Sequence, residues 1–340
     1  MIDSINQPLV SIIITSFNRE RWIEKAIQSA MDQDYNNIEI IISDNKSTDG
    51  SDSLIKKYCY DERVKYWQNE TNIGMLPNFK KATDLAKGLF VTYVSSDDYL
   101  VNKSFISEAV SIMTEYPNIV VFSGISKNYK LSAKKEKHNT AYNFKVSNGL
   151  LNKTVNGKAV FSIFQHSHVL NFGGSVFYTD HLLNLDVFRE PNTTYADLQT
   201  VLLLALRGDF YFSDKVDYMQ NFHDQSASLA YADAEKSLLN LSFAEIPFEE
   251  AKKINFLPEE ALRKWHYSII KPFIFSSMVS LFKTNKTEYQ KFIKKISKKY
   301  PDILSDIMRN KKMRIFKFIY NNKALSFLHK KFESIFNKKK

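Results

Sequence analysis

The 340-residue chain is 44% hydrophobic and 25% charged, a composition that predicts a globular protein with a sizeable core and two or so domains. Its single cysteine, Cys59, excludes an internal disulfide framework and thiolate metal sites, and it is typical of a reducing cytoplasm. We expect no secretory signal, because no positive region followed by an apolar stretch opens the sequence. The apolar run at 265–282 contains Lys271 and Pro272, which makes it a poor transmembrane span.

The positive charge is concentrated in the last quarter of the chain. Residues 251–340 carry 23 Lys and Arg against six Asp and Glu, a net charge of +17, whereas residues 1–250 carry a net charge of −7. A basic protein often binds nucleic acid, but here only the tail is basic. This asymmetry predicts a tail that docks on a surface and no nucleic-acid partner.

Apolar runs and amphipathic segments alternate along the first 116 residues. The apolar runs at 10–15, 38–42 and 64–67 and the segment 91–100 predict buried strands. Apolar residues at helical spacing predict helices at 19–31 and 76–86, and a short helix follows the turn residues near 50. Strands and helices in this order need right-handed crossovers, so we predict an α/β fold with a mostly parallel sheet flanked by helices.

The middle of the chain is less regular. A fifth strand is predicted at 119–122, and the polar stretch 127–158 is typical of a mobile insertion or lid. Apolar order returns at 160–164, followed by Gly173-Gly174, a helix at 195–206 and a strand at 210–216. We therefore expect one domain over residues 1–230 and a helical region over residues 231–340.

The C-terminal region contains basic amphipathic helices. Residues 289–300 and 325–336 place aromatic and aliphatic side chains at helical spacing, with lysines between them. Such helices either pack on the first domain with a solvated lysine face or dock on a membrane surface. Charge segregation and aromatic content favour membrane docking.

The segment 91–100, VTYVSSDDYL, ends an apolar strand in two adjacent carboxylates, Asp97 and Asp98. Open α/β sheets bind ligands at the carboxyl ends of their strands, and Mg²⁺ is held by one or two carboxylates plus substrate phosphates. The segment therefore predicts a metal-diphosphate site. A helix cap before the helix that begins near Asn102 is an equal alternative for these residues taken alone.

Four segments in order resemble the nucleotide-binding half of family 2 glycosyltransferases of the GT-A fold. They are VSIIITSFNRER, IEIIISDNKSTDGS, NETNIGMLPNFKKATDLAKG and VTYVSSDDYL. The resemblance is strong over residues 8–125, weak over 160–230 and absent from the C-terminal helices. It implies a Rossmann-like GT-A fold and a hexosyltransferase-type enzyme that moves a sugar, with inversion, from a nucleotide-sugar donor to an acceptor.

The resemblance also implies the setting of the reaction. The donor is expected to be a UDP-sugar, and the acceptor a glycan or lipid-linked precursor of a cell-surface polysaccharide. The cofactor is expected to be Mn²⁺ or Mg²⁺. The protein is expected in the cytoplasm, at the inner face of the cell membrane. No feature of the sequence indicates an oligomeric state.

The resemblance implies a set of donor-binding residues: Thr15, Phe17, Asn18, Asp44, Asn72, Asn78, Ser96 and Asp97. Asp44 matches the aspartate that recognises the base, where a carboxylate can accept the uracil N3–H. The alternative for Asp44 is a turn residue that bonds its own backbone. For Thr15 and Phe17, simple packing is the alternative.

The resemblance implies that Asp98 and His223 bind the metal. Ser96-Asp97-Asp98 matches the DxD motif with Ser in place of the first Asp, and Mg²⁺ or Mn²⁺ can complete its shell with diphosphate oxygens and water. His223, in NFHDQSAS, resembles a Tyr-Arg-x-His segment in which Gln220 and Asn221 replace Tyr and Arg. A structural hydrogen-bonding histidine is an equal alternative.

The resemblance assigns the catalytic base to Asp197, in TYADLQ. It sits where the family has a Glu-Asp motif, with Ala196 in place of the Glu. The alternative is an acidic residue that favours a helix N-terminus. His166 and His168 are expected to be acceptor-cleft or core residues.

Two other functions fit parts of the pattern. A sugar nucleotidyltransferase would use a metal, a diphosphate and a similar sheet, but TSFNRER after the first strand lacks the usual glycines. A non-catalytic scaffold that binds nucleotide sugars would tolerate the loss of Asp98 or Asp197, and both are present.

Overall fold

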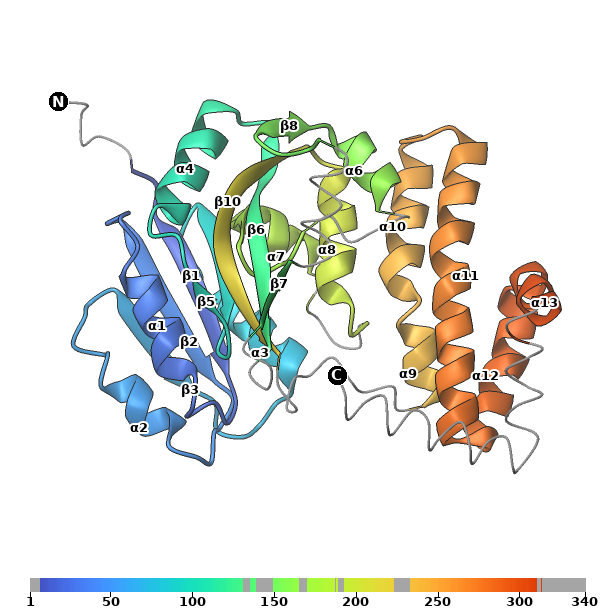
Figure 1. Cartoon of the computed structure of the whole chain (residues 1–340), viewed down its shortest axis with the longest axis horizontal. Helices are drawn as coiled ribbons and strands as arrows, with labels where there is room; N and C mark the ends of the chain where they lie inside the picture. Colours follow the sequence, from blue (N-terminus) through green and yellow to red (C-terminus); the bar gives the residue numbers. More distant parts are fainter. Residues whose placement is uncertain are drawn as a thin grey trace.

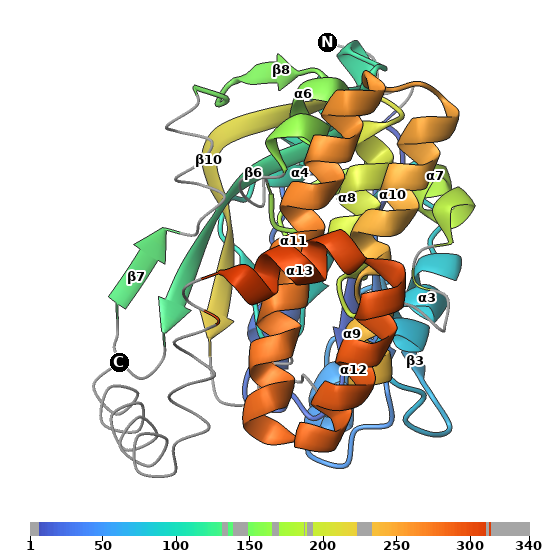
Figure 2. The same cartoon turned by 90° about the vertical axis from the view of Figure 1, so that its right-hand side faces the viewer.

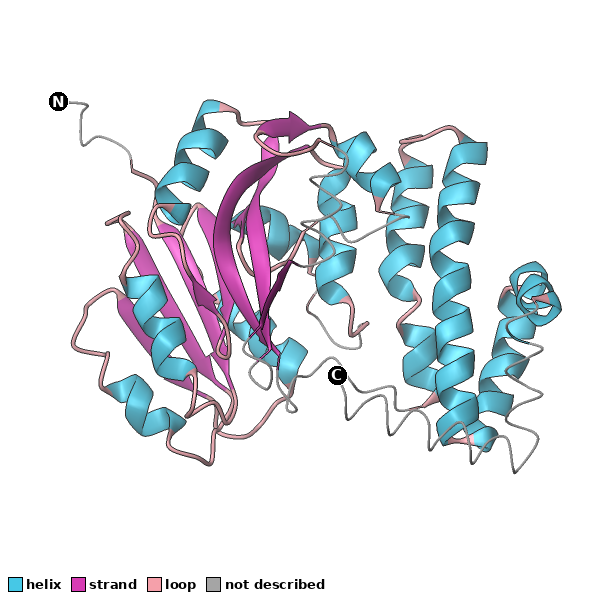
Figure 3. Cartoon of the chain, in the orientation of Figure 1, coloured by secondary structure: helices cyan, strands magenta, loops and turns pink. Residues whose placement is uncertain are grey.

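A computed structural model describes residues 7–130, 135–138, 149–164, 170–186, 188, 193–222, 233–310 and 313. Within these residues a sheet of ten strands occupies the N-terminal two thirds of the chain, and helices form the rest (Figure 3). The strands are β1 Val10–Ser16, β2 Ile38–Asp44, β3 Val64–Gln68, β4 Phe90–Ser95, β5 Tyr99–Leu100, β6 Ile119–Lys130, β7 Lys135–His138, β8 Lys153–Val155, β9 Ser175–Tyr178 and β10 Asp209–Phe222.

The helices cover both faces of the sheet and then continue beyond it (Figure 1). They are α1 Ile23–Met31, α2 Ser51–Lys56, α3 Met75–Asp84, α4 Phe105–Glu115, α6 Gly157–Ile163, α7 Thr179–Leu185, α8 Ala196–Ala205, α9 Ala234–Leu239, α10 Ser242–Lys253, α11 Glu259–Thr284, α12 Lys286–Lys299 and α13 Pro301–Arg309.

The sheet has the strand order β3-β2-β1-β4-β9-β6-β10-β5, with β7 beside β6 and β8 beside β10. Strand β1 pairs in parallel with β2 and β4, and β2 pairs in parallel with β3. The predicted α/β alternation is therefore confirmed. Strand β9 lies antiparallel between β4 and β6, so the sheet is mixed beyond its first four strands.

Side chains of β1 alternate between two cores because successive residues of a strand point to opposite faces. Ile12 and Ile14 are fully buried in a core with α1, α2 and α4. Ile13 is buried in a second core, which includes α3, α7 and α8 and continues into the C-terminal helices. Both faces are covered, as expected for continuously apolar parallel strands.

Part of the stretch predicted as an irregular insertion is regular structure. Strand β6 extends to Lys130 and pairs with β10 over its length, and β7 and β8 add short antiparallel strands. The prediction of a mobile insertion over 127–158 is wrong for these residues. Pairing of β6 and β8 with β10 provides hydrogen-bond partners for their backbone groups, so the segment forms strands although it lacks the apolar pattern from which strands are predicted.

The C-terminal helices pack on the first domain. Trp265 of α11 is buried, stacks on Phe161 of α6 at 4.1 Å between ring centroids, and donates its Nε1–H to the Phe161 carbonyl at 2.6 Å. On α12, Phe292 and Ile296 are fully buried, which leaves the lysines outside. Figure 2 shows α13 crossing over α11. The proposed boundary at residue 230 stays a prediction, since one core extends across it.

Among the helices described here, none is long and apolar enough to cross a membrane. The second basic amphipathic segment, at 325–336, lies outside the described residues.

Candidate active site

A cavity of about 440 Å³ opens at the carboxyl ends of β1 and β4, beside the end of β10. Parallel strands bring their C-terminal loops to one edge of the sheet, and this is where open α/β sheets bind ligands. The residues that line the cavity are Thr15, Ser16, Phe17, Arg19, Asn45, Asn72, Gly74, Met75, Asn78, Phe79, Ser95, Ser96, Asp97, Asp98, Gln220, Asn221 and Phe222.

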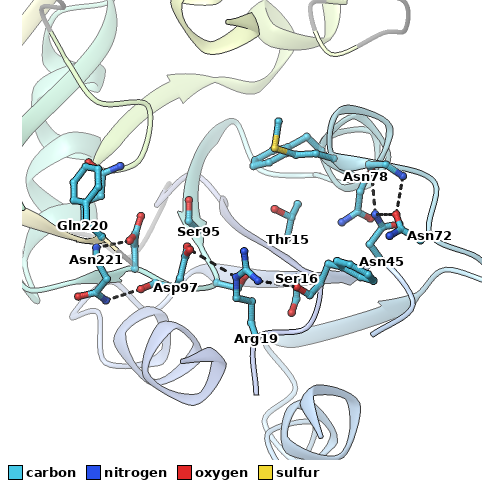
Figure 4. A pocket seen from close by; sticks show the side chains of 17 residues that line it. Thr15, Ser16, Arg19, Asn45, Asn72, Asn78, Ser95, Asp97, Gln220 and Asn221 are labelled. Atoms are coloured by element: carbon cyan, nitrogen blue, oxygen red, sulfur yellow. Dashed lines mark hydrogen bonds and ion pairs between the residues drawn. The ribbon is translucent and has the colours of Figure 1, made fainter. Parts of the chain in front are cut away.

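One end of the cavity is built from neutral amides. The Asn45 side chain donates from Nδ2 to Asn72 Oδ1 at 2.7 Å and accepts from the Ile73 amide at 2.9 Å. Asn78, which is buried, donates to the Ser43 carbonyl at 3.0 Å. Figure 4 shows these asparagines grouped on one side of Thr15. Their bonds hold the loop before α3 against the end of β2.

Apolar side chains border the same end. Phe17, Ile73 and Met75 are exposed, and Phe17 and Met75 also line the cavity. An exposed Phe and an exposed Met beside polar amides suit a flat ligand ring, because its faces can pack on the apolar side chains and its edges can hydrogen-bond to the amides.

Asp44 and Asn18 lie outside the cavity lining. Asp44 is fully buried, and its Oδ2 accepts from the Ser47 amide and from Gln68 Nε2, both at 3.0 Å. The Ser47 hydroxyl donates to the other carboxylate oxygen. This geometry is that of the turn alternative, and the neighbouring Asn45 faces the cavity instead. Asn18 has a left-handed backbone (φ 53°) and accepts from the Thr48 amide at 2.8 Å, which ties two loops together.

The other end of the cavity is acidic. Asp98 is only 5% exposed, and both its carboxylate oxygens accept bonds from β10: Oδ2 from the Tyr218 hydroxyl at 2.7 Å and Oδ1 from the Asn221 amide at 2.8 Å. Burial, with the neighbouring charge of Asp97, raises the pKa of Asp98 to about 7. A cation beside Asp98 would offset this cost of burying the charge.

Arg19 brings a positive charge to the acidic end. Its Nε lies 3.7 Å from Asp97 Oδ2, and its Nη1 donates to the carbonyls of Phe17 at 3.1 Å and Asn18 at 3.0 Å. Figure 4 shows Arg19 and Asp97 facing each other. The carbonyl contacts fix the guanidinium at the cavity, where it can bind an anionic group in a bidentate manner.

The residues present fit a divalent metal that is held jointly with a substrate. No group of three or more His, Cys, Asp or Glu that could hold a metal occurs among the residues that the structure describes. Asp97 and Asp98 supply two carboxylates at the cavity, which is the number that Mg²⁺ commonly takes from protein when phosphates complete its shell. His223, His166 and His168 lie outside the described residues, so their predicted roles stay predictions.

Asp197 lies in the first turn of α8, with its side chain exposed and outside the cavity lining. Only residues 206–208 join α8 to β10, so the two elements run in opposite directions. The start of α8 is therefore at the end of the molecule where β10 finishes at the cavity (Figure 1).

Of the predicted donor and metal residues, the structure brings six together with Asp98 at the cavity: Thr15, Phe17, Asn72, Asn78, Ser96 and Asp97. Sequence reasoning missed several residues that line it, among them Ser16, Arg19 and Asn45. The Ser16 hydroxyl is buried without a hydrogen-bond partner among the described residues. Arg19 could have been predicted as a phosphate-binding residue, because it is a positively charged residue shortly after the first strand.

Comparisons with known proteins agree with this geometry. Residues 11–172 match the sequence profile of Glycosyl transferase family 2. A Campylobacter jejuni GalNAc(5)-diNAcBac-PP-undecaprenol beta-1,3-glucosyltransferase is 40% identical over 98 residues, which are 28% of this chain and 31% of that protein. The Escherichia coli UDP-Glc:alpha-D-GlcNAc-diphosphoundecaprenol beta-1,3-glucosyltransferase WfaP is 35% identical over 118 residues, which are 33% of this chain and 47% of WfaP. The chain thus spans from under a third to about half of these curated relatives.

A solved structure supports the fold. The S. aureus TarS 1–349 structure in complex with UDP-GlcNAc has a TM-score of 0.66 and 21% identity, covering 85% of this chain and 80% of that one. At this identity the likeness establishes the fold alone, and it agrees with the GT-A fold expected from the sequence. Residues 11–172, just under half of the chain, thus carry the sequence profile of Glycosyl transferase family 2.

Proposed function

We propose that the protein is a metal-dependent, inverting glycosyltransferase that moves a sugar from a UDP-sugar to a glycan or lipid-linked acceptor of cell-surface polysaccharide synthesis. The observation that carries the proposal is one cavity, at the carboxyl edge of the sheet, with an amide and apolar end and an acidic end. A nucleotide sugar is arranged in a matching way: its flat base suits the amide and apolar end, and its diphosphate, with a bound metal ion, suits the acidic end.

The names of the relatives support the donor and acceptor classes. The two glucosyltransferases above act on diphospho-undecaprenol-linked glycans, and the name of one gives UDP-Glc as donor. TarS was solved with UDP-GlcNAc, and a Pyrobaculum calidifontis mannosyltransferase with a TM-score of 0.52 and 12% identity was solved with GDP-Man and Mn²⁺. Both structures place a nucleotide sugar in proteins of this fold.

In this proposal the base lies between Phe17 and Met75 beside the amides, and the diphosphate lies at Arg19, Asp97 and Asp98. Asp98 would hold Mn²⁺ or Mg²⁺ and Asp97 would contact the donor; the metal would supply positive charge that stabilises the leaving diphosphate. Arg19 is placed to bind a phosphate oxygen in exchange for its contact with Asp97.

Inversion needs one base to take the proton from the acceptor hydroxyl as it attacks the anomeric carbon. Asp197 is assigned this role because it is an exposed carboxylate at the start of α8, at the cavity end of the molecule. A positioned general base contributes roughly 10²- to 10⁴-fold to the rate.

The basic C-terminal helices are proposed to dock on the inner face of the cell membrane, where a lipid-linked acceptor resides. Lys294 and Lys298 are exposed on the side of α12 away from buried Phe292 and Ile296, whereas Lys295 pairs with Glu235 of α9. Anionic lipids attract such lysines with about 1 kcal/mol each near the surface. Substitution of both Lys294 and Lys298 by Glu is expected to reduce binding to phosphatidylglycerol vesicles, and unchanged binding would contradict the membrane assignment.

The test of the chemistry is sugar transfer and donor hydrolysis with Mn²⁺ in matched variants. Asp197→Ala is expected to lose about 10²- to 10⁴-fold in kcat while its donor KM stays unchanged, and Asp98→Ala is expected to lose both activity and Mn²⁺-dependent donor binding. Asp180→Ala is the control, because Asp180 is an exposed acidic residue in the first turn of α7. Activity that survives both Asp98→Ala and Asp197→Ala would refute the mechanism.

The donor is identified by a thermal-shift panel of UDP-, GDP- and dTDP-sugars with Mn²⁺, since a ligand that binds only the folded state raises its melting temperature. We expect the largest rise with a UDP-sugar. A rise with GDP-mannose alone would refute the UDP assignment and leave the reaction class intact.

A further inference from the structure

The segment that leads into α8 is held by the C-terminal helices. Asn240, between α9 and α10, is only 5% exposed, and its Oδ1 accepts from the Thr194 amide at 2.8 Å and the Thr194 hydroxyl at 2.9 Å. The Thr193 hydroxyl is shared between the same oxygen at 3.2 Å and the Asn240 carbonyl at 3.3 Å. One side-chain oxygen thus gathers donors from two successive residues.

Aromatic and amide contacts extend this attachment. The Tyr195 ring packs edge-on against Phe273 of α11 at 5.1 Å between centroids and contacts Phe243 of α10 at 5.7 Å. Gln199, one turn into α8, is buried and donates to the Ser242 carbonyl at 3.3 Å. The start of α8 is therefore fixed from outside by α10 and α11 as well as by Asn240.

The start of α8 has one local side-chain bond, from the Tyr195 backbone amide to the Thr193 hydroxyl at 3.1 Å, and no cap bond from its N-cap residue. Tyr195 occupies its N-cap position with φ −103° and ψ 36°, and it makes no side-chain cap bond. Ser, Thr, Asp and Asn are preferred at this position because their side chains accept from the first helical amides. Without such a cap, we expect the direction of the first turn to depend on this Thr193 bond and on the tertiary contacts of residues 193–195.

We propose that Asn240 is a positioning residue, through which the C-terminal helices orient Asp197 for proton transfer. The inference rests on the base role assigned to Asp197 under the proposed function. Asp197 follows Thr194 by three residues, so a shift of the Thr193–Thr194 backbone moves the first turn of α8 directly. Misplacement of a catalytic group by about 1 Å can reduce the rate about 10²-fold.

This inference gives the C-terminal helices a second role, which is distinct from membrane docking. Contacts to residues 193–199 come from Asn240, Ser242, Phe243 and Phe273, all before α12. The exposed lysines proposed to dock on the membrane lie on α12. The two roles can therefore be separated by substitutions in different helices.

The test uses the full chain and three variants. Asn240→Ala removes the acceptor, and Asn240→Asp keeps an oxygen at the same place. Asn285→Ala is the control, because Asn285 also accepts two backbone amides, those of Thr287 and Glu288 at the start of α12, far along the chain from α8. Each variant is assayed for kcat, donor KM, melting temperature and binding of UDP with Mn²⁺.

We expect Asn240→Ala to lower kcat about 10- to 100-fold, with donor KM and UDP binding within about twofold of wild type. Asn240→Asp should recover most of kcat, and Asn285→Ala should lower the melting temperature while kcat is kept. Wild-type kcat in Asn240→Ala, or an equal loss of kcat in Asn285→Ala, would overturn the inference.

A double-variant cycle separates positioning from general destabilisation. If Asn240 acts through Asp197, adding Asn240→Ala to Asp197→Ala should change kcat less than twofold, whereas independent effects would multiply. Multiplied losses overturn the inference and leave the proposed function standing. Full transfer by Asp197→Ala alone overturns the base assignment, and this inference with it.

Discussion

Substitution of Asp98 by Asn is expected to stabilise the protein in the absence of metal. Burial and the Asp97 charge raise the pKa of Asp98 from its ordinary value of 3.8 to about 7. Between these two pH values the folded protein binds more protons at this group than the unfolded chain does, so stability falls as pH rises through that window. Above pH 7 the full cost of holding the ionised carboxylate is present.

The size of the effect follows from the shift in pKa. A difference of about three pKa units corresponds to about 4 kcal/mol at most, with 1.36 kcal/mol per unit. This shift already includes the hydrogen bonds from the Tyr218 hydroxyl and the Asn221 backbone amide, which favour the ionised form. In the variant one of these two donors meets the side-chain NH₂ group, and a mismatched buried group costs about 1–3 kcal/mol. We therefore expect a net gain of about 1–3 kcal/mol at pH 8.

The assay is thermal and urea unfolding of wild type and Asp98→Asn in EDTA at pH 8 and pH 4.5. The gain should be present at pH 8 and lost at pH 4.5, where wild-type Asp98 is protonated. Asp180→Asn, an exposed carboxylate on α7, should show no such pH dependence. A variant that is less stable than wild type at pH 8, or a gain that is equal at both pH values, would refute this reasoning.

Three further outcomes are expected. Arg19→Ala should weaken UDP binding by about tenfold or more in calorimetric titrations, since a bond to a charged group is worth about 1.5–3 kcal/mol; Arg21→Ala, which changes an exposed neighbour, should stay within twofold. Asn45→Ala should release the loop at 72–74, seen as faster amide exchange and a higher donor KM, whereas unchanged exchange would contradict its role in holding the loop. Trp265→Ala should cost about 3–5 kcal/mol in urea unfolding, and a loss below about 1 kcal/mol would show that α11 docks without this contact.

The sequence predicts the first half of the sheet well because its signal is local. The parallel strands β1, β2 and β4 are continuous apolar runs, and their order brings the loops with Phe17 and Asp98 to one edge without knowledge of any distant contact. The position of β9 is different. It enters antiparallel between β4 and β6 from about 80 residues along the chain, and no local pattern indicates which strands it separates.

The site shows the same division between local and distant information. Asp44 and Asn45 differ by one position, yet only Asn45 lines the cavity, because neighbouring residues at the end of a strand point in opposite directions. Sequence resemblance can locate this strand end but cannot decide between the two side chains. Tyr218 binds Asp98 across 120 residues, and that contact depends on the pairing of β10 with β5.

The C-terminal helices show why a surface pattern is an incomplete guide to function. Their lysines and aromatic residues predict docking on a membrane surface. This prediction concerns only the exposed face of α12, because the lysines on that face can be recognised directly in the sequence. Other parts of this region face the sheet domain: Asn240, between α9 and α10, and Phe273, on α11, contact residues 193–195. A buried asparagine between two helices has no periodic signal, although its bonds hold the residues that precede α8. If Asp197 is the base and Asn240 positions it, a region outside the matched family profile sets the geometry of the proton transfer in the proposed reaction.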